Sequence, residues 1–156
     1  MLLRALIENT STTSDYKCEH GLSLYIETQK HKILFDTGAS GLFAENASVM
    51  GIDLSKVNIA VISHGHHDHG GGLKTFLGIN SQAKVYIHGK AFEKHYGNRP
   101  SGVIEDIGLD AVGKYLLDTN SMCFACHCTG IESYERLKSI MGDRVEYLST
   151  GEKITI

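Results

Sequence analysis

The chain of 156 residues lacks several features that define special classes of protein. No apolar run reaches the roughly 18 residues that a membrane-spanning helix needs. The apolar stretch at residues 1–7 is too short for a signal peptide. No internal repeat, low-complexity tract or linker-like stretch is visible. We therefore expect a cytoplasmic protein with no membrane partner.

Positive charge is also scarce, with 15 Lys and Arg against 18 Asp and Glu and a formal net charge of -3. Proteins that bind nucleic acid usually carry a basic patch or stripe that neutralises phosphates. No basic run of that kind is present here. The sequence therefore predicts no nucleic-acid partner.

What remains is an ordinary composition, 42% hydrophobic and 21% charged, which excludes a disordered chain. At roughly 100–200 residues per domain, the length predicts one domain over residues 1–156. Two counts stand out, namely nine His, and 17 Gly against a single Pro.

Short β-like runs alternate with amphipathic runs along the chain, and this order predicts an α/β fold. Strands are expected over residues 2–7, 22–28, 32–36, 57–63, 84–88, 122–126, 144–148 and 153–156. Helices are expected over 41–50, 73–77, 90–96, 111–117 and 130–141. For the last helix, Thr129 and Glu132 form a capping-box pattern and Gly142 ends it.

The main motif is His64-Gly-His66-His67-Asp68-His69-Gly-Gly-Gly72, which follows an apolar, β-branched strand. Imidazole and carboxylate donors suit zinc, and also iron or manganese. The glycines disfavour a helix, so we expect a non-helical loop whose backbone can approach closely. The alternative is a solvated His-rich loop that binds metal only adventitiously.

The sequence resembles the metallo-β-lactamase fold superfamily at three ordered places. His64-x-His66-x-Asp68-His69 is similar to its metal motif, and Phe35-Asp36-Thr37-Gly38 to its first motif. The segment His127-Cys-Thr-Gly130 resembles the C-terminal motif of a branch named dihydropterin-aminobenzene-phosphate synthase-like hydrolases. The segments Glu8–Ser11, His20–Tyr25 and Gly51–Ser55 also resemble that branch. The resemblance implies an αββα sandwich, here truncated in its second half.

The resemblance also implies a set of site residues, position by position. His64 and His66 would bind a first metal. Asp68 and His69 would bind a second metal, with His127 as a distal ligand. Asp36 would orient the motif without binding metal, because a ligating His needs its other nitrogen fixed. The alternative role of Asp36 is to close a turn between a strand and a helix. His67 is not expected to be a ligand.

The chain is shorter than the family members that it resembles, chiefly between about residues 97 and 120. The family's further Cys-Ala-His-type motif, which completes the first metal site, is not found. His88 and Cys126 are further candidate ligands, Cys123 and Cys128 are alternative thiolate donors, and a second subunit is another source. Missing strands would also expose sheet edges, so we expect a homodimer or higher oligomer.

Cys123-x-x-Cys126-His127 also fits the attachment pattern of c-type haem. That interpretation requires export and leaves the histidine loop unexplained.

From the motifs together we favour a metal-dependent hydrolase that acts on a small molecule. Zinc, as one or two ions, would activate water against an ester, phosphoester or related bond, and Asp68 would orient that water. The alternative is a non-catalytic descendant that binds metal or a partner protein.

Overall fold

We describe the fold from a computed structural model, which defines residues 1–87, 123–125, 127 and 129–155. The predicted helices at 90–96 and 111–117 lie outside the described residues. The candidate ligands His88 and Cys126 lie outside them as well. By spatial contacts the chain divides into two compact units, Met1–His95 with Ser149–Ile156 and Tyr96–Leu148. Each unit is described by itself.

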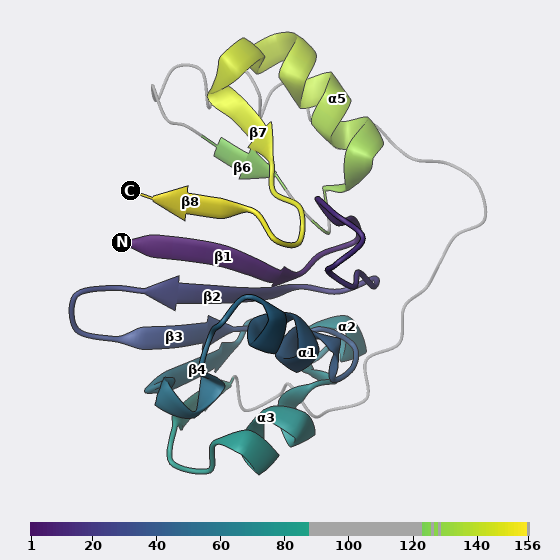
Figure 1. Cartoon of the computed structure of the whole chain (residues 1–156). Helices are drawn as coiled ribbons and strands as arrows, with labels where there is room; N and C mark the ends of the chain where they lie inside the picture. Colours follow the sequence, from purple (N-terminus) through teal and green to yellow (C-terminus); the bar gives the residue numbers. More distant parts are fainter. Residues whose placement is uncertain (88–122, 126, 128, 156) are drawn as a thin grey trace. The chain divides into compact units, whose positions relative to one another are not determined.

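The first unit is built on a six-stranded mixed sheet in the order β5-β4-β3-β2-β1-β8 (Figure 1). Strand β1 is antiparallel to β8 and to β2, and β2 is antiparallel to β3, whereas β3, β4 and β5 are parallel to one another. The bounds are β1 Leu2–Ile7, β2 Ser23–Glu27, β3 Lys32–Phe35, β4 Ile59–Ile62, β5 Lys84–Ile87 and β8 Lys153–Thr155.

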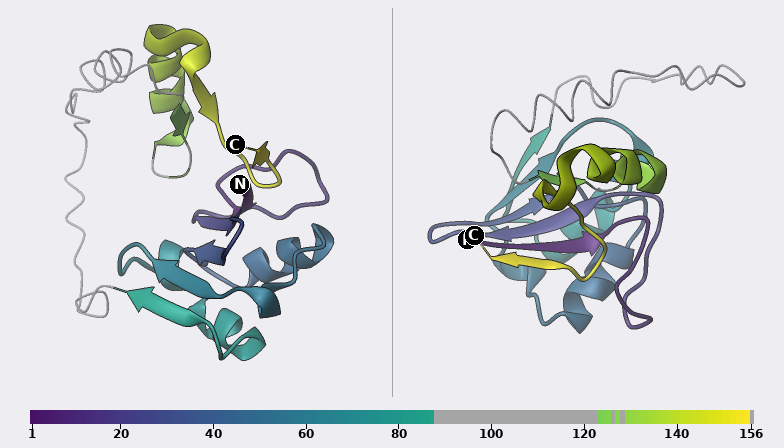
Figure 2. Two further views of the ribbon diagram at one scale, coloured as in Figure 1. Left: turned by 90° about the vertical axis from the view of Figure 1, so that its left-hand side faces the viewer. Right: turned by 90° about the horizontal axis from the view of Figure 1, so that it is seen from above.

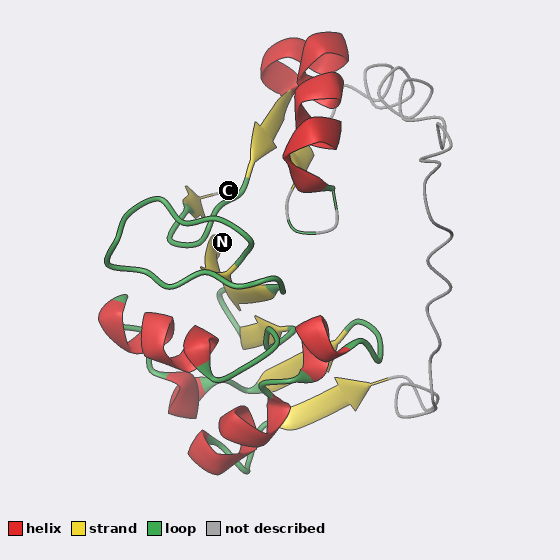
Figure 3. Ribbon diagram, turned by 90° about the vertical axis from the view of Figure 1, so that its right-hand side faces the viewer, coloured by secondary structure: helices red, strands yellow, loops and turns green. Residues whose placement is uncertain are grey.

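Parallel strands need crossover connections, and helices supply them here. Helix α1 (Leu42–Val49) and the short η1 (Leu54–Lys56) connect β3 to β4. Helices α2 (His67–Gly70) and α3 (Leu73–Ile79) connect β4 to β5 (Figure 3). Phe43 of α1 and Phe76 of α3 are fully buried in one cluster with Leu34 and Ala60 of the sheet. This packing fixes the first helical layer on the sheet.

The parallel pairing of β3 with β4 determines where the polar residues after these strands lie. Phe35 pairs with Val61, so the C-terminal ends of the two parallel strands lie side by side. Asp36 follows β3 and Ser63 follows β4. The two residues are consequently neighbours, although 27 positions separate them in the sequence.

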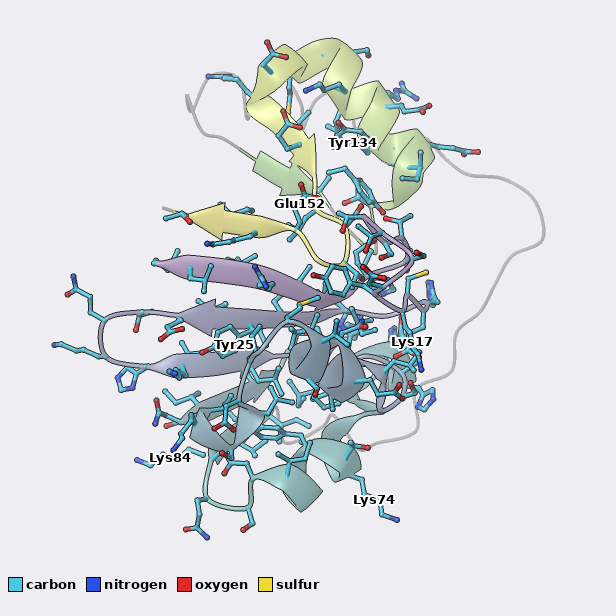
Figure 4. All side chains as sticks on the ribbon, in the orientation of Figure 1. Lys17, Tyr25, Lys74, Lys84, Tyr134 and Glu152 are labelled. Carbon is cyan, nitrogen blue, oxygen red and sulfur yellow. The ribbon has the colours of Figure 1, made fainter. Side chains whose placement is uncertain are left out.

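The second unit contains a parallel pair of short strands, β6 (Cys123–Ala125) and β7 (Val145–Tyr147), with helix α5 (Gly130–Met141) and η2 (Gly142–Arg144) between them in sequence (Figure 2). Ala125, Leu137, Met141 and Val145 form its buried cluster. Tyr134 lies on α5 (Figure 4). Its ring meets that of Tyr147 of β7 edge-on, with the ring centroids 5.3 Å apart.

The capping-box prediction at Thr129 is wrong. Thr129 has helical backbone angles, and its side chain makes no capping hydrogen bond. A capping side chain requires an extended backbone at that position to reach back to the first turn. Among the described helices, none is both long and apolar enough to span a bilayer.

Candidate metal centre

The histidine motif begins directly after β4 and contains one turn of helix. This turn, α2 (His67–Gly70), contradicts the expectation of a non-helical loop. The Gly70 N–H donates to the His66 carbonyl at 3.1 Å, and the Gly71 N–H donates to the His67 carbonyl at 2.7 Å. Tertiary contacts therefore override the low helix propensity of glycine.

Two of the glycines are required by close backbone packing. A Cβ at Gly71 would collide with the Ala39 carbonyl, and a Cβ at Gly72 with the Thr37 carbonyl. The Thr37 N–H and hydroxyl both donate to the His69 carbonyl, at 2.8 and 3.1 Å. The turn after β3 thus holds the histidine motif by its backbone, as expected from the glycine-rich sequence.

The Asp36 carboxylate holds the histidine motif in place through hydrogen bonds. Asp36 is fully buried, with a φ of 58°, a left-handed conformation that a short Asp side chain tolerates. Its Oδ1 accepts from the Ser63 N–H at 2.8 Å, and its Oδ2 accepts from the Ser63 hydroxyl at 2.8 Å. Oδ2 also accepts from Nδ1 of His69 at 2.7 Å. The carboxylate therefore fixes both ends of the Ser63–His69 segment.

These bonds determine which nitrogen each imidazole presents. Nδ1 of His69 is engaged by Asp36, so its Nε2 is the remaining ligand atom. Nδ1 of His64 lies 2.9 Å from the Ser63 hydroxyl oxygen. Because that hydroxyl donates its proton to Asp36, it accepts from Nδ1 of His64. Both rings thus present Nε2, and Ser63 is a site residue that the sequence analysis missed.

The imidazole ring of His64 lies next to the rings of His66 and His69. The ring centroid of His64 is 4.5 Å from that of His66 and 4.1 Å from that of His69. Burial lowers the pKa of His64, and electrostatic interaction with the neighbouring His69 and His66 lowers it further. The neutral imidazole, which is the form that binds metal, is therefore favoured at His64.

Asp68 lies at the open side of the cluster with its side chain 21% exposed. Its Oδ2 is 3.9 Å from Nε2 of His69 and 3.4 Å from Nε2 of His20. His20 was not among the predicted site residues, although it stands in one of the segments that carried the family resemblance. Its distance in sequence from the histidine motif concealed it.

The other histidines of the predicted site differ in how exposed they are. His66 and His67 are exposed at the start of α2. His127 belongs to the second unit, two positions after the end of β6, and is buried. A cavity of about 280 Å³ adjoins the motif within the first unit. Its lining consists of Ile62, His64, Gly65, His66, His67, Gly70, Gly71, Leu73 and Ile87.

Comparisons with known proteins give the family. Residues 16–112, more than half of the chain, match the model of the metallo-beta-lactamase superfamily. A solved structure, Tm1679, described as a metal-dependent hydrolase of the beta-lactamase superfamily, has a TM-score of 0.74 at 17% identity. The alignment covers 100% of this chain and 99% of that one.

Two relatives come from Methanocaldococcus jannaschii. An uncharacterized protein is 32% identical over 108 residues, covering 68% of this chain and 42% of the relative. A 7,8-dihydropterin-6-methyl-4-(beta-D-ribofuranosyl)-aminobenzene-5'-phosphate synthase is 31% identical over 96 residues, covering 56% of this chain and 32% of the relative. The matches thus span less than half of the length of these two relatives.

The chain is an α/β protein with a mixed sheet and the metallo-β-lactamase fold, as the sequence predicted. It belongs to the metallo-beta-lactamase superfamily, whose members are commonly metal-dependent hydrolases. Tm1679 shares this fold across the alignment, which covers 100% of this chain and 99% of that one.

Proposed function

We propose that the chain is a metal-dependent hydrolase that acts on an ester, phosphoester or related bond of a small molecule. His64, His66, Asp68 and His69 would hold the metal, as one or two zinc ions. The observation that carries the proposal is the buried Asp36 carboxylate, which fixes His69 directly and His64 through Ser63. A solvated His-rich loop would need no such support.

The donor set fits a divalent metal. Imidazole nitrogens and a carboxylate oxygen are the usual ligands of catalytic zinc, and they also suit iron and manganese. The second ring nitrogen of a metal-binding imidazole generally donates an N–H hydrogen bond to a carboxylate or a carbonyl, as Nδ1 of His69 does to Asp36. His127, which the resemblance assigns as a distal ligand, remains part of the proposal.

When bound, such a metal polarises the scissile group and lowers the pKa of a water toward about 7. The residues of the chain contribute the rest. Asp36 keeps the proton of His69 on Nδ1, so the ring cannot rotate away. Asp68, whose side chain is 21% exposed, would orient the attacking water by accepting a hydrogen bond from it. Ile62, Leu73 and Ile87 contribute apolar surface to the lining of the pocket beside the motif.

A direct test combines metal content with turnover. The purified chain, loaded with zinc and desalted, is assayed against a panel of esters and phosphodiesters. Dihydropterin and aminobenzene-phosphate compounds join the panel because of the name of the second relative. His66→Ala and Asp68→Ala should lose activity, whereas His31→Ala, an exposed His near β3, should not. Activity that survives both site variants and chelation would refute the mechanism.

A non-catalytic metal-binding protein is the second candidate. The observation that favours it is the partial match, which covers 42% and 32% of the two relatives. The catalytic parts of those longer proteins need not be contained in the matched segment. Stoichiometric zinc without turnover on the whole panel would support this candidate over the hydrolase.

We also propose that the chain forms a homodimer or higher oligomer in the cytoplasm. Among the strands described, β5 and β8 lie at the two edges of the six-stranded sheet. Edge strands offer backbone groups that can pair with another chain. Light scattering at micromolar concentration should give at least twice the mass of one chain, and a clean monomer would refute this proposal.

A further inference from the structure

His20 and Asp68 lie side by side although 48 positions separate them in the sequence, so the fold brings them together. Nε2 of His20 is 3.4 Å from Oδ2 of Asp68. The His20 side chain is 77% exposed, and that of Asp68 is 21% exposed. Both residues belong to the first unit.

The distance between these two atoms fits two ligands of one metal ion. Zinc binds imidazole nitrogen and carboxylate oxygen at about 2.0–2.2 Å in a tetrahedral arrangement. Two ligand atoms on such an ion are then about 3.3–3.6 Å apart. A charge-assisted hydrogen bond between the same groups would bring them to about 2.7–2.9 Å. The observed 3.4 Å lies within the first range and outside the second.

The position of His20 is set by backbone contacts rather than by its exposed side chain. The Leu22 N–H donates to the Asp68 carbonyl at 3.1 Å, and the Leu22 carbonyl accepts from the Gly38 N–H at 2.8 Å. A Cβ at Gly21 would lie only 2.7 Å from the Asp68 carbonyl oxygen. Glycine at position 21 therefore allows the backbone before β2 to lie directly against the metal motif.

We propose that His20 is a metal ligand that binds the same ion as Asp68. The inference rests on the proposed function, since it adds a ligand to that metal site. The resemblance assigns Asp68 and His69 to the second metal, so His20 would be a further ligand of that ion and would not fill the gap at the first metal. His20 would contribute an imidazole from the segment before β2, which is distant in sequence from every ligand that the resemblance implied.

The test measures metal binding and not turnover. Zinc affinity is measured by calorimetry on the full chain, and Co²⁺ replaces zinc for absorption spectra, which report the donor atoms. The variants are His20→Ala and His20→Lys, with His31→Ala as the control on another exposed imidazole. His20→Lys keeps a positive charge beside Asp68 but offers no neutral imidazole. Thermal unfolding of each metal-free variant checks the fold.

We expect His20→Ala and His20→Lys to weaken zinc binding by at least about tenfold, the lower bound for removing even an outer partner of a ligand. The Co²⁺ spectrum should change in both variants and stay unchanged in His31→Ala. If the wild type binds zinc and His20→Ala binds it equally well, His20 is not a ligand, and the proposed function stands. Full binding by His20→Lys, or an unchanged Co²⁺ spectrum, would also overturn the assignment. If the wild type binds no metal, the proposed function and this inference both fail.

Discussion

The centre contains two carboxylates in contrasting surroundings. Asp36 is fully buried, and its oxygens accept hydrogen bonds from Ser63 and His69. Asp68 is partly exposed, and its Oδ2 lies 3.4–3.9 Å from the imidazole nitrogens of His20 and His69. The same side-chain type is thus held tightly by the protein in one place and left at ligand-like distances in the other.

The difference indicates two separate tasks. A buried carboxylate with well-formed hydrogen bonds stabilises the folded state and orients its neighbours. A partly exposed carboxylate with imidazole nitrogens at 3.4–3.9 Å suits metal binding and contributes less to folding. Substitutions can separate the two tasks, because stability and metal affinity should respond differently.

The largest effect on stability is expected from Asp36→Ala. Removing the carboxylate leaves the Ser63 N–H, the Ser63 hydroxyl and the His69 ring without their buried acceptor. The free energy of unfolding of the metal-free chain should fall by about 3–5 kcal/mol, as measured by urea denaturation. Asp36→Asn, which keeps the shape and tolerates the positive φ, should lose less. If the free energy of unfolding of Asp36→Ala matched that of the wild type within error, Asp36 would not have the structural role that distinguishes it from Asp68.

Asp68→Ala should show the opposite behaviour. Metal-free stability should change by less than about 1 kcal/mol, because partly exposed ion pairs contribute little. Zinc affinity should fall by at least about tenfold. Asp143→Ala, at a fully exposed carboxylate in the second unit, is the control and should alter neither quantity. A large loss of metal-free stability in Asp68→Ala would show that this carboxylate is structural as well.

Ser63→Ala should have an intermediate effect that passes through His64. Without the hydroxyl, Nδ1 of His64 loses its partner and the ring no longer favours the tautomer that presents Nε2. Zinc affinity should fall by about 10–100-fold, and Ser63→Thr should restore it. The ¹⁵N shifts of His64 in the metal-free chain, recorded where the ring is neutral, should show mixed tautomers only in the Ala variant. Unchanged shifts would remove Ser63 from the account.

The smallest effect is expected from His67→Ala. His67 is exposed at the first position of α2, and neither the resemblance nor the ring contacts include it among the ligands. Zinc affinity and unfolding should both match the wild type, which makes this variant the control within the motif itself. A clear loss of affinity would mean that the ligand set is wrong.

Most of the sheet could be predicted from local pattern. The expected strand at residues 2–7 coincides with β1, and the expected strand at 32–36 differs from β3 by one residue. Alternating or β-branched apolar runs carry that information within a few positions. The single turn α2 was missed because its stability comes from Thr37, which is distant in sequence and donates to the His69 carbonyl.

The site was predicted in part for the same reason. The histidine motif and Asp36 follow strands and resemble known motifs, so the sequence identified them. Ser63 and His20 carry no spacing signal, since their roles arise from the pairing of β3 with β4 and from the approach of Gly21 to Asp68. The assignments of His64, His66, Asp68, His69 and His127 as metal ligands stay predictions, as do Asp36 as the orienting residue and His88 and Cys126 as further candidate ligands.

The central claim is that the histidine motif binds metal, and zinc content tests it most directly. The wild type and Asp68→Ala are loaded with zinc, desalted and measured by mass spectrometry together with protein concentration. The account predicts stoichiometric zinc on the wild type and a clear loss on the variant. A wild type that retains no more zinc than Asp68→Ala would contradict it.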